Sequence, residues 1–199
     1  EHKLADPLTR LMILCNPQNP SGNVWSDGDL ARVGELCAKH HVTVVSDEVH
    51  GDIVRPGVTH MPFAAVNELN RSICVTCSSP SKAFNVAGLQ SAYFICDDDG
   101  LRARAVRGVN TDEVAEPNDF AVFSTIAAYT DGGAWLDDLC RVVQRNKDYV
   151  SAQLDEHAHD MLHMVASDST YLAWIDCSGL LDRVGDANAE RFCGFRRSH

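Results

Sequence analysis

The sequence contains no long apolar run, no cluster of basic residues and no internal repeat. No stretch approaches the roughly 20 apolar residues of a membrane-spanning helix, and Glu1 to Asp6 do not resemble a secretory signal peptide. Nucleic-acid binding needs clustered Lys and Arg, whereas these 199 residues have a net charge of −11 and a pI near 5.1. We therefore expect neither a membrane nor a nucleic acid as a partner.

The cysteines do not follow the spacing of a disulfide framework or a zinc finger. Most of the eight lie inside apolar runs, as Cys15 does, which predicts small buried side chains in a reducing cytoplasm. Cys74 and Cys77 form a C-x-x-C, but in a strand their side chains would point to opposite faces. No second pair follows at zinc-finger spacing, so we expect no metal site there.

The first third of the chain alternates between strand and helix patterns. The apolar run Leu11–Cys15 predicts a strand buried on both faces. Ser26 is expected to cap the following helix together with Asp29, and Val42–Val45 predicts the next strand. A strand, a helix and a second strand in this order indicate a parallel sheet covered by helices.

Further strands are expected at 72–77 and 92–96, and helices dominate after Pro117, which suits a first helical turn. Phe120, Phe123, Ile126 and Ala127 should share one helix face. Asp131 to Gly133 should end that helix before a long one from about Trp135 to His157, and 171–175 resembles a strand. We predict an α/β fold: a three-layer large domain with a mostly parallel sheet over residues 1–134, and a partial α+β small domain over 135–199.

Polar clusters follow three of the predicted strands, at residues 16–22, 46–50 and 78–85. Ligands of open parallel sheets bind beyond the carboxyl ends of the strands. Each cluster alone is weak evidence, because an Asn-Pro turn, a helix-capping Asp and a Ser-rich loop with a Lys are common without any catalytic role. Their order and spacing together carry much more information.

The three clusters read N-P-x-N-P-x-G, S-D-E and S-x-S-K-x-F-N-x-A-G-L. This combination is similar to fold-type I enzymes dependent on pyridoxal 5'-phosphate (PLP), in the aminotransferase class I/II superfamily. It most resembles the cystathionine β-lyase, or C–S lyase, branch, as do residues 127–136 and 170–176. The resemblance covers roughly residues 10 to 178.

The resemblance implies a role for each of five residues. Lys82 would hold the cofactor covalently and move the Cα proton of the substrate. Asp47 would keep the pyridine nitrogen protonated, so that the cofactor accepts the electrons of a carbanion. Asn19 would donate to the phenolic oxygen of the cofactor. Ser79 would bind its phosphate, and Ser81 would add to that site. We expect these groups to converge on one cleft, with a cofactor-sized space between Lys82 and Asp47.

Two positions depart from the pattern of typical transaminases. His50 stands where many of them have a Tyr, which fits the lyase branch better and places His50 in the cofactor pocket. Gln90 stands where a phosphate-binding Arg is common, so phosphate binding must depend on other groups.

Members of this family are considerably longer than 199 residues, so we expect this chain to be part of a longer protein. The phosphate loop, the aromatic residue that stacks on the cofactor, the arm that reaches the partner subunit and the Arg that binds the substrate carboxylate have no counterpart here. Arg196 and Arg197 do not resemble that last motif. We expect the isolated chain to bind PLP weakly and to have impaired activity. The resemblance also implies a cytoplasmic homodimer.

The implied reaction is α,β-elimination of a cysteine S-conjugate such as cystathionine, giving pyruvate, ammonia and a thiol. Transamination of amino acids is the main alternative, because it uses the same residues up to the carbanion. A DExH-type ATPase is a remote alternative: the run 44–50 resembles a DExH box, but G-x-x-x-x-G-K-[ST] is absent. A non-catalytic regulatory role through protein contacts is another.

A metal site formed by Asp47, Glu48, His50 and Asp52 is a further alternative. On a continuous strand, Glu48, His50 and Asp52 would share a face, so such a site has a feasible geometry. We expect instead that Glu48 and His50 support the cofactor pocket or a loop, with no metal bound.

Overall fold

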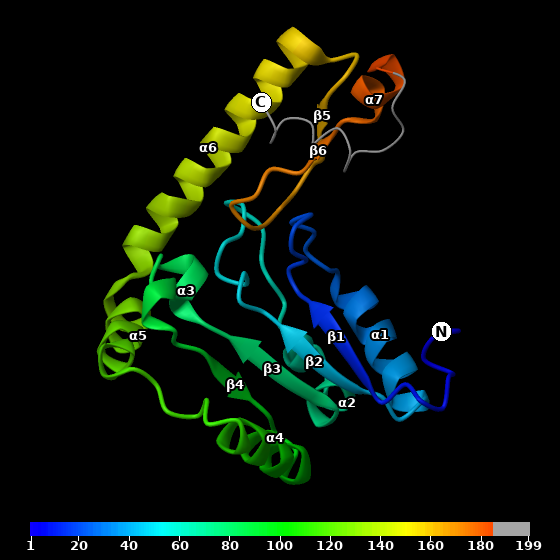
Figure 1. Cartoon of the computed structure of the whole chain (residues 1–199), viewed down its shortest axis with the longest axis vertical. Helices are drawn as coiled ribbons and strands as arrows, with labels where there is room; N and C mark the ends of the chain where they lie inside the picture. Colours follow the sequence, from blue (N-terminus) through cyan, green and yellow to red (C-terminus); the bar gives the residue numbers. More distant parts are fainter. Residues whose placement is uncertain (185–199) are drawn as a thin grey trace.

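The computed structural model describes residues 1–184, which form an α/β fold around a four-stranded sheet (Figure 1). Strands β1 (Leu11–Cys15), β2 (Thr43–Asp47) and β3 (Cys74–Ser78) run parallel, in that spatial order. Strand β4 (Tyr93–Ile95) pairs with β3 in the antiparallel direction. The α/β class with a mostly parallel sheet is thereby confirmed.

Helix α1 (Asp27–Lys39) connects β1 to β2 and covers one face of the sheet. The predicted cap at Ser26 is confirmed, because its side chain accepts a hydrogen bond from the Asp29 amide at 3.1 Å. The apolar face of α1 packs against the strands and makes the main core. The buried residues of this core are Leu14, Leu30, Cys37, Val42, Val44, Phe63 and Cys74.

The opposite face of the sheet is only partly covered. Ile13 is 68% exposed and Leu11 is 51% exposed, so the prediction that this strand is buried on both faces is wrong for the described residues. Helix α4 (Asp99–Thr111) lies at the far end of the sheet, near β3 and β4 (Figure 1). Its Leu101 lines a hollow together with Val75. A continuous apolar run therefore does not by itself fix burial on both faces.

The connections contain short elements that periodicity did not predict. They are η1 (Phe63–Ala65), α2 (Glu68–Ser72), α3 (Pro80–Ala83) and η2 (Ala87–Leu89). The strand expected at 72–77 starts two residues later, because Ser72 ends α2. Helix α4 was also not predicted, and none of its residues is buried.

The predicted break between two consecutive helices is confirmed. Helix α5 (Asp119–Asp131) ends at Gly132, and α6 (Gly133–Ala158) begins there and runs slightly longer than expected at both ends. Pro117 lies outside α5, because Asn118 is the N-cap and its side chain accepts from the Phe120 amide.

The expected apolar face of α5 does not pack against the described part of the chain. Phe120 and Phe123 are 73% and 74% exposed, and Ile126 is also exposed. The only buried residue of α5 is Ala121. The helical spacing was predicted correctly, but which face packs inward depends on neighbours that periodicity does not identify.

Helix α6 rises away from the sheet to a second, small group of elements (Figure 1). This group contains β5 (His163–Met164), β6 (Ile175–Asp176) and α7 (Ser178–Val184). The strand expected at 171–175 is wrong except for its last residue. The domain boundary near residue 134 stays a prediction, and Arg191 to His199 lie outside the described residues.

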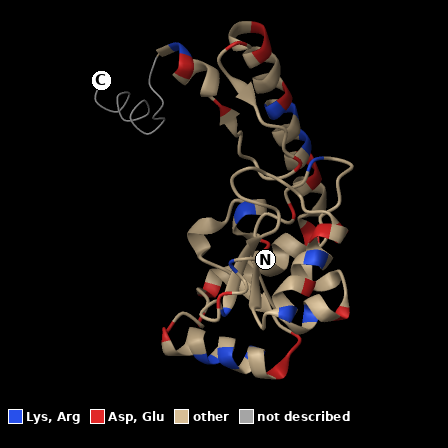
Figure 2. Ribbon diagram, turned by 90° about the vertical axis from the view of Figure 1, so that its right-hand side faces the viewer, with Lys and Arg blue, Asp and Glu red and all other residues tan. Residues whose placement is uncertain are grey.

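Charged residues do not divide the described chain into acidic and basic halves. Lys and Arg are spread over several elements and are interleaved with Asp and Glu (Figure 2). Among residues 1–184, none of the helices combines the length and apolar character needed to cross a membrane.

Candidate functional site

The three polar clusters lie at one edge of the sheet, as predicted. Because β1, β2 and β3 are parallel, their carboxyl ends are adjacent, with Cys15 paired to Asp47 and Asp47 paired to Cys77. The loop with Asn19, the turn with His50 and the helix with Lys82 follow these three strand ends. This edge is the candidate functional site.

His50, in the second cluster, is affected by charges from the second and the third cluster. Its side chain is buried, with 3% of the residue exposed, and neither ring nitrogen has a hydrogen-bond partner in the described part of the chain. Burial lowers the pKa of His50; the charge of Asp47 opposes this shift and the charge of Lys82 reinforces it. His50 is therefore within electrostatic reach of both Asp47 and Lys82.

The two adjacent carboxylates have different surroundings. Asp47 is half-buried, and its Oδ1 accepts from the Val49 amide at 3.2 Å. Glu48 is 5% exposed and accepts from the Ser46 hydroxyl at 2.7 Å and from the Phe63 amide at 2.9 Å. Burial raises the pKa of Glu48. Glu48 thus holds η1 against the sheet, whereas Asp47 has an oxygen left to accept a further bond.

The geometry assumed for a metal site is wrong. Strand β2 ends at Asp47, so Glu48, His50 and Asp52 do not share the face of a continuous strand. Within residues 1–184, no group of three or more His, Cys, Asp or Glu side chains is arranged to hold an ion. The C-x-x-C cysteines are both free: Cys74 is buried in β3, and Cys77 is half-buried.

Lys82 lies on the short helix α3, which Ser79 caps. The Ser79 hydroxyl accepts from the Ser81 amide at 3.0 Å, contacts the Ser81 hydroxyl at 2.7 Å and donates to the Ser91 carbonyl. Lys82 is half-buried. The phosphate roles of Ser79 and Ser81 stay predictions. To donate to a phosphate, the Ser79 hydroxyl would have to give up its hydrogen bond to the Ser91 carbonyl.

The loop after β1 is ordered by Gln18 rather than by Asn19. The Gln18 side chain accepts from the Ser21 amide at 2.9 Å, and the Gln18 carbonyl accepts from the Gly22 amide at 2.8 Å. Asn16 is buried and donates to the Met61 carbonyl. Asn19 is exposed on this loop. Its approach to the Asp47 side chain stays a prediction.

One aromatic contact of the site was not predicted. The ring of Tyr171 meets His50 edge-on, with the ring centroids 5.8 Å apart. Tyr171 belongs to a motif that the sequence singled out, but no local spacing relates it to His50. Gln90, at the position of the expected phosphate-binding Arg, is exposed. Arg196 and Arg197 lie outside the described residues.

Comparisons with known proteins identify the relatives of this chain. Cystathionine beta-lyase PatB of Bacillus subtilis (strain 168) is 44% identical over 184 residues, which make up 92% of this chain and 47% of that protein. Protein MalY of Escherichia coli (strain K12) is 36% identical, over 88% of this chain and 44% of MalY. The chain thus spans about half the length of these relatives.

A solved structure shows the same similarity in three dimensions. The PLP-bound C-S lyase from Staphylococcus hominis superposes with a TM-score of 0.84 at 32% identity, over 94% of this chain and 47% of that one. The sequence model of the family described as aminotransferase class I and II matches residues 1–193. The chain therefore belongs to the aminotransferase class I and II family.

Proposed function

We propose that this chain carries the cofactor-binding part of a PLP-dependent C–S β-lyase. The observation that carries the proposal is the position of His50, a buried imidazole without hydrogen-bond partners, within reach of both Asp47 and Lys82. The name of the PatB relative, cystathionine beta-lyase, supports the reaction type. The family match favours this function over a DExH-type ATPase.

The residues at this edge fit PLP. A buried polar group without a partner is costly, so the two ring nitrogens of His50 favour a ligand that offers hydrogen-bonding atoms. The Asp47 carboxylate and the Lys82 amine, both within electrostatic reach of His50, are the groups that would hold the two ends of the cofactor ring. When bound, PLP supplies an electron sink for an amino-acid carbanion.

Asp47 and Lys82 would have the main chemical roles in catalysis. The Asp47 carboxylate, which keeps an oxygen free of the Val49 amide, would hold a proton on the pyridine nitrogen. Lys82 would hold the cofactor covalently, and its amine, released when the substrate amino group takes its place, would take the proton from the substrate Cα. His50 would orient the cofactor ring with its free nitrogens.

The remaining predicted residues would bind the edges of the cofactor. Asn19 would donate its side-chain amide to the phenolic oxygen. Ser81 and Ser79 would approach the phosphate, with Ser79 giving up its bond to the Ser91 carbonyl. The substrate would be a small amino acid, in particular a cysteine S-conjugate such as cystathionine.

An aminotransferase is the second candidate, because B. subtilis aspartate aminotransferase is also similar, at 23% identity over 148 residues. His50 in place of a Tyr and the higher identity to PatB favour the lyase. We further propose a homodimer, supported by the exposed apolar residues of α5, and a cytoplasmic location, supported by the seven free cysteines among the described residues.

The test uses the complete product of the gene that encodes this chain, supplied with PLP and cystathionine. Pyruvate should appear, and Asp47→Asn should slow its release roughly 100-fold or more, because losing about two pKa units on the pyridine nitrogen corresponds to about 3 kcal/mol. Cofactor affinity should change far less. The exposed Asp131→Asn is the matched control and should leave the rate unchanged.

Two results would contradict the proposal. Equal rates for the wild type and Asp47→Asn would remove Asp47 from its role. Amino transfer to a keto acid without any pyruvate release would replace the lyase by the aminotransferase.

A further inference from the structure

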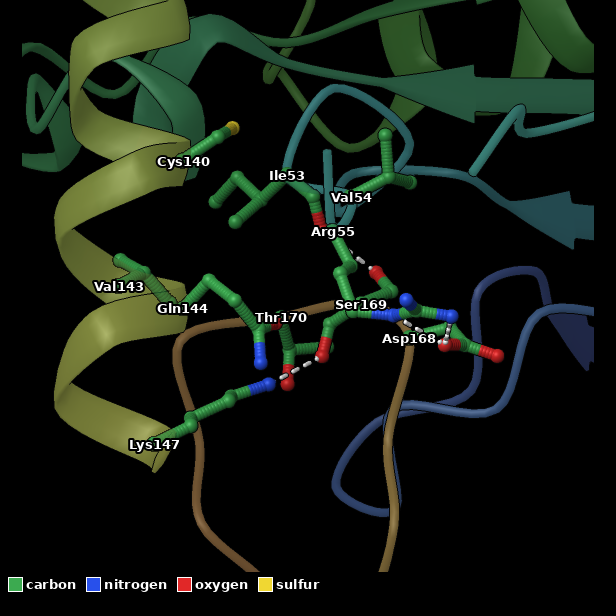
Figure 3. A pocket seen from close by; sticks show the side chains of 10 residues that line it. All are labelled: Ile53, Val54, Arg55, Cys140, Val143, Gln144, Lys147, Asp168, Ser169 and Thr170. Atoms are coloured by element: carbon green, nitrogen blue, oxygen red, sulfur yellow. Dashed lines mark hydrogen bonds and ion pairs between the residues drawn. The ribbon is translucent and has the colours of Figure 1, made fainter. Parts of the chain in front are cut away.

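Helix α6 contains a buried lysine for which the proposed function has no role. Lys147 is 7% exposed, and its ammonium donates to the Ser167 hydroxyl at 2.7 Å. It also donates to the Ser169 carbonyl at 2.8 Å (Figure 3). Burial lowers the pKa of Lys147, and the charge of Asp168 opposes this shift. Since a buried ammonium is costly, its contacts must contribute something that an apolar side chain would not.

The space around Lys147 is too small for a ligand. The adjacent cavity, lined by Ile53, Val143 and Gln144 among others, has a volume of about 10 Å³ (Figure 3). Such a volume holds at most one water molecule. The contacts of Lys147 within the chain must therefore explain why it is buried.

Lys147 binds a segment, Ser167–Thr170, that we call the strap. The strap lies against the loop that carries Asn19: the amides of Asp168 and Ser169 both donate to the Gly22 carbonyl at 3.0 Å. Gly22 has a φ of +72°, and a Cβ atom there would lie 2.5 Å from the Ser169 carbonyl oxygen. The glycine of the N-P-x-N-P-x-G motif is thus required by the close approach of the strap.

The strap also contacts the turn that carries His50. The Ser169 hydroxyl donates to the Ile53 carbonyl at 2.8 Å, and the Thr170 amide donates to the same carbonyl at 2.9 Å. The Ile53 amide in turn donates to the His50 carbonyl at 3.0 Å. Tyr171, directly after the strap, meets the His50 ring. One segment therefore joins both loops on the β1 and β2 side of the candidate site.

We propose that Lys147 is a positioning residue, which holds the strap against Gly22 and Ile53 and so fixes the loop of Asn19 and the turn of His50. The effect of Lys147 on cofactor binding rests on the proposed function. Its contacts with the strap do not depend on that function. Without the ammonium, the buried carbonyl of Ser169 would lose its donor.

The second charged contact of the strap is weaker. Arg55 and Asp168 form an ion pair at 2.7 Å, but their side chains are 46% and 47% exposed. Exposed ion pairs contribute little to stability. Lys147, on the buried side, is the stronger attachment.

Hydrogen exchange of the 199-residue chain without cofactor tests the inference. In Lys147→Met, the amides of the strap, Gly22 and Ile53 should exchange about tenfold faster or more, as expected from the loss of charged hydrogen bonds. Lys147→Arg should restore much of the protection, because it keeps a charged donor. The exposed Lys39→Met is the matched control and should not change exchange at these positions.

Exchange that speeds up by the same factor throughout the chain, with no larger change at the strap, Gly22 and Ile53, would overturn the inference. Faster exchange of the strap with unchanged Gly22 and Ile53 amides would also overturn it. A separate titration of the complete gene product with PLP should give about tenfold weaker binding for Lys147→Met. If the wild type does not bind PLP but the exchange pattern is as expected, the proposed function is overturned and the positioning role is supported. If the wild type and Lys147→Met bind PLP equally well, Lys147 has no effect on cofactor binding.

Discussion

Two lysines in different regions of this chain show what separates a structural lysine from one available for chemistry. Lys147, in α6, is buried and donates to two neutral oxygens at normal distances. Lys82, at the sheet edge, is half-buried and within electrostatic reach of His50, an imidazole with two free nitrogens. Burial alone does not indicate reactivity. Unsatisfied polar neighbours mark the site at which a ligand is expected.

The largest expected difference between the two lysines is in the free energy of unfolding of their variants. Lys147→Met should lower the free energy of unfolding by about 1–3 kcal/mol, because the buried Ser169 carbonyl is left without its donor and the half-buried Ser167 hydroxyl loses its charged partner. Lys82→Met should change it by less than about 0.5 kcal/mol, the usual range for a side chain without such contacts. Urea denaturation followed by circular dichroism measures both. Equal losses would contradict the comparison.

A smaller effect is expected from the pH dependence of stability. Burial lowers the pKa of His50 below its ordinary value of 6.5, so the unfolded chain takes up the proton first as the pH falls. The stability that neutral His50 contributes is complete above 6.5 and is lost as the pH falls through the folded pKa. His60 acts in the same direction, whereas Glu48, whose pKa is raised from 4.5, favours folding towards lower pH.

His50→Asn should therefore lose less stability than the wild type between about pH 7 and about pH 5. Thermal denaturation across this range measures the difference, and His2→Asn, at an exposed position, is the control. If His50→Asn follows the wild-type curve, His50 is not held neutral by its surroundings.

The sequence predicted what depends on local patterns. Alternating strand and helix patterns, with polar residues directly after each strand, placed Asp47 and Lys82 at one edge of the sheet. The Ser26 cap and the helix break before α6 followed from turn and capping chemistry. These features need only neighbouring residues, so one sequence suffices to predict them.

Contacts between distant segments could not be predicted in this way. The strap contacts Gly22, which lies almost 150 residues earlier in the chain. The apolar stripe of α6 gave no indication that Lys147 is buried. The exposure of Ile13 likewise depends on which elements cover the sheet. Long-range packing, not local propensity, decides these features.

The most direct test of the central claim maps covalent attachment of PLP among the four lysines of the chain. The chain is mixed with limiting PLP, reduced with borohydride and digested, and the modified peptide is identified by mass spectrometry. We predict that the label lies on Lys82, and that buried Lys147 stays unlabelled. Exposed Lys3 and Lys39 should react only with excess cofactor. Label on Lys147, or equal label on Lys3, Lys39 and Lys82, would contradict the assignment of this site.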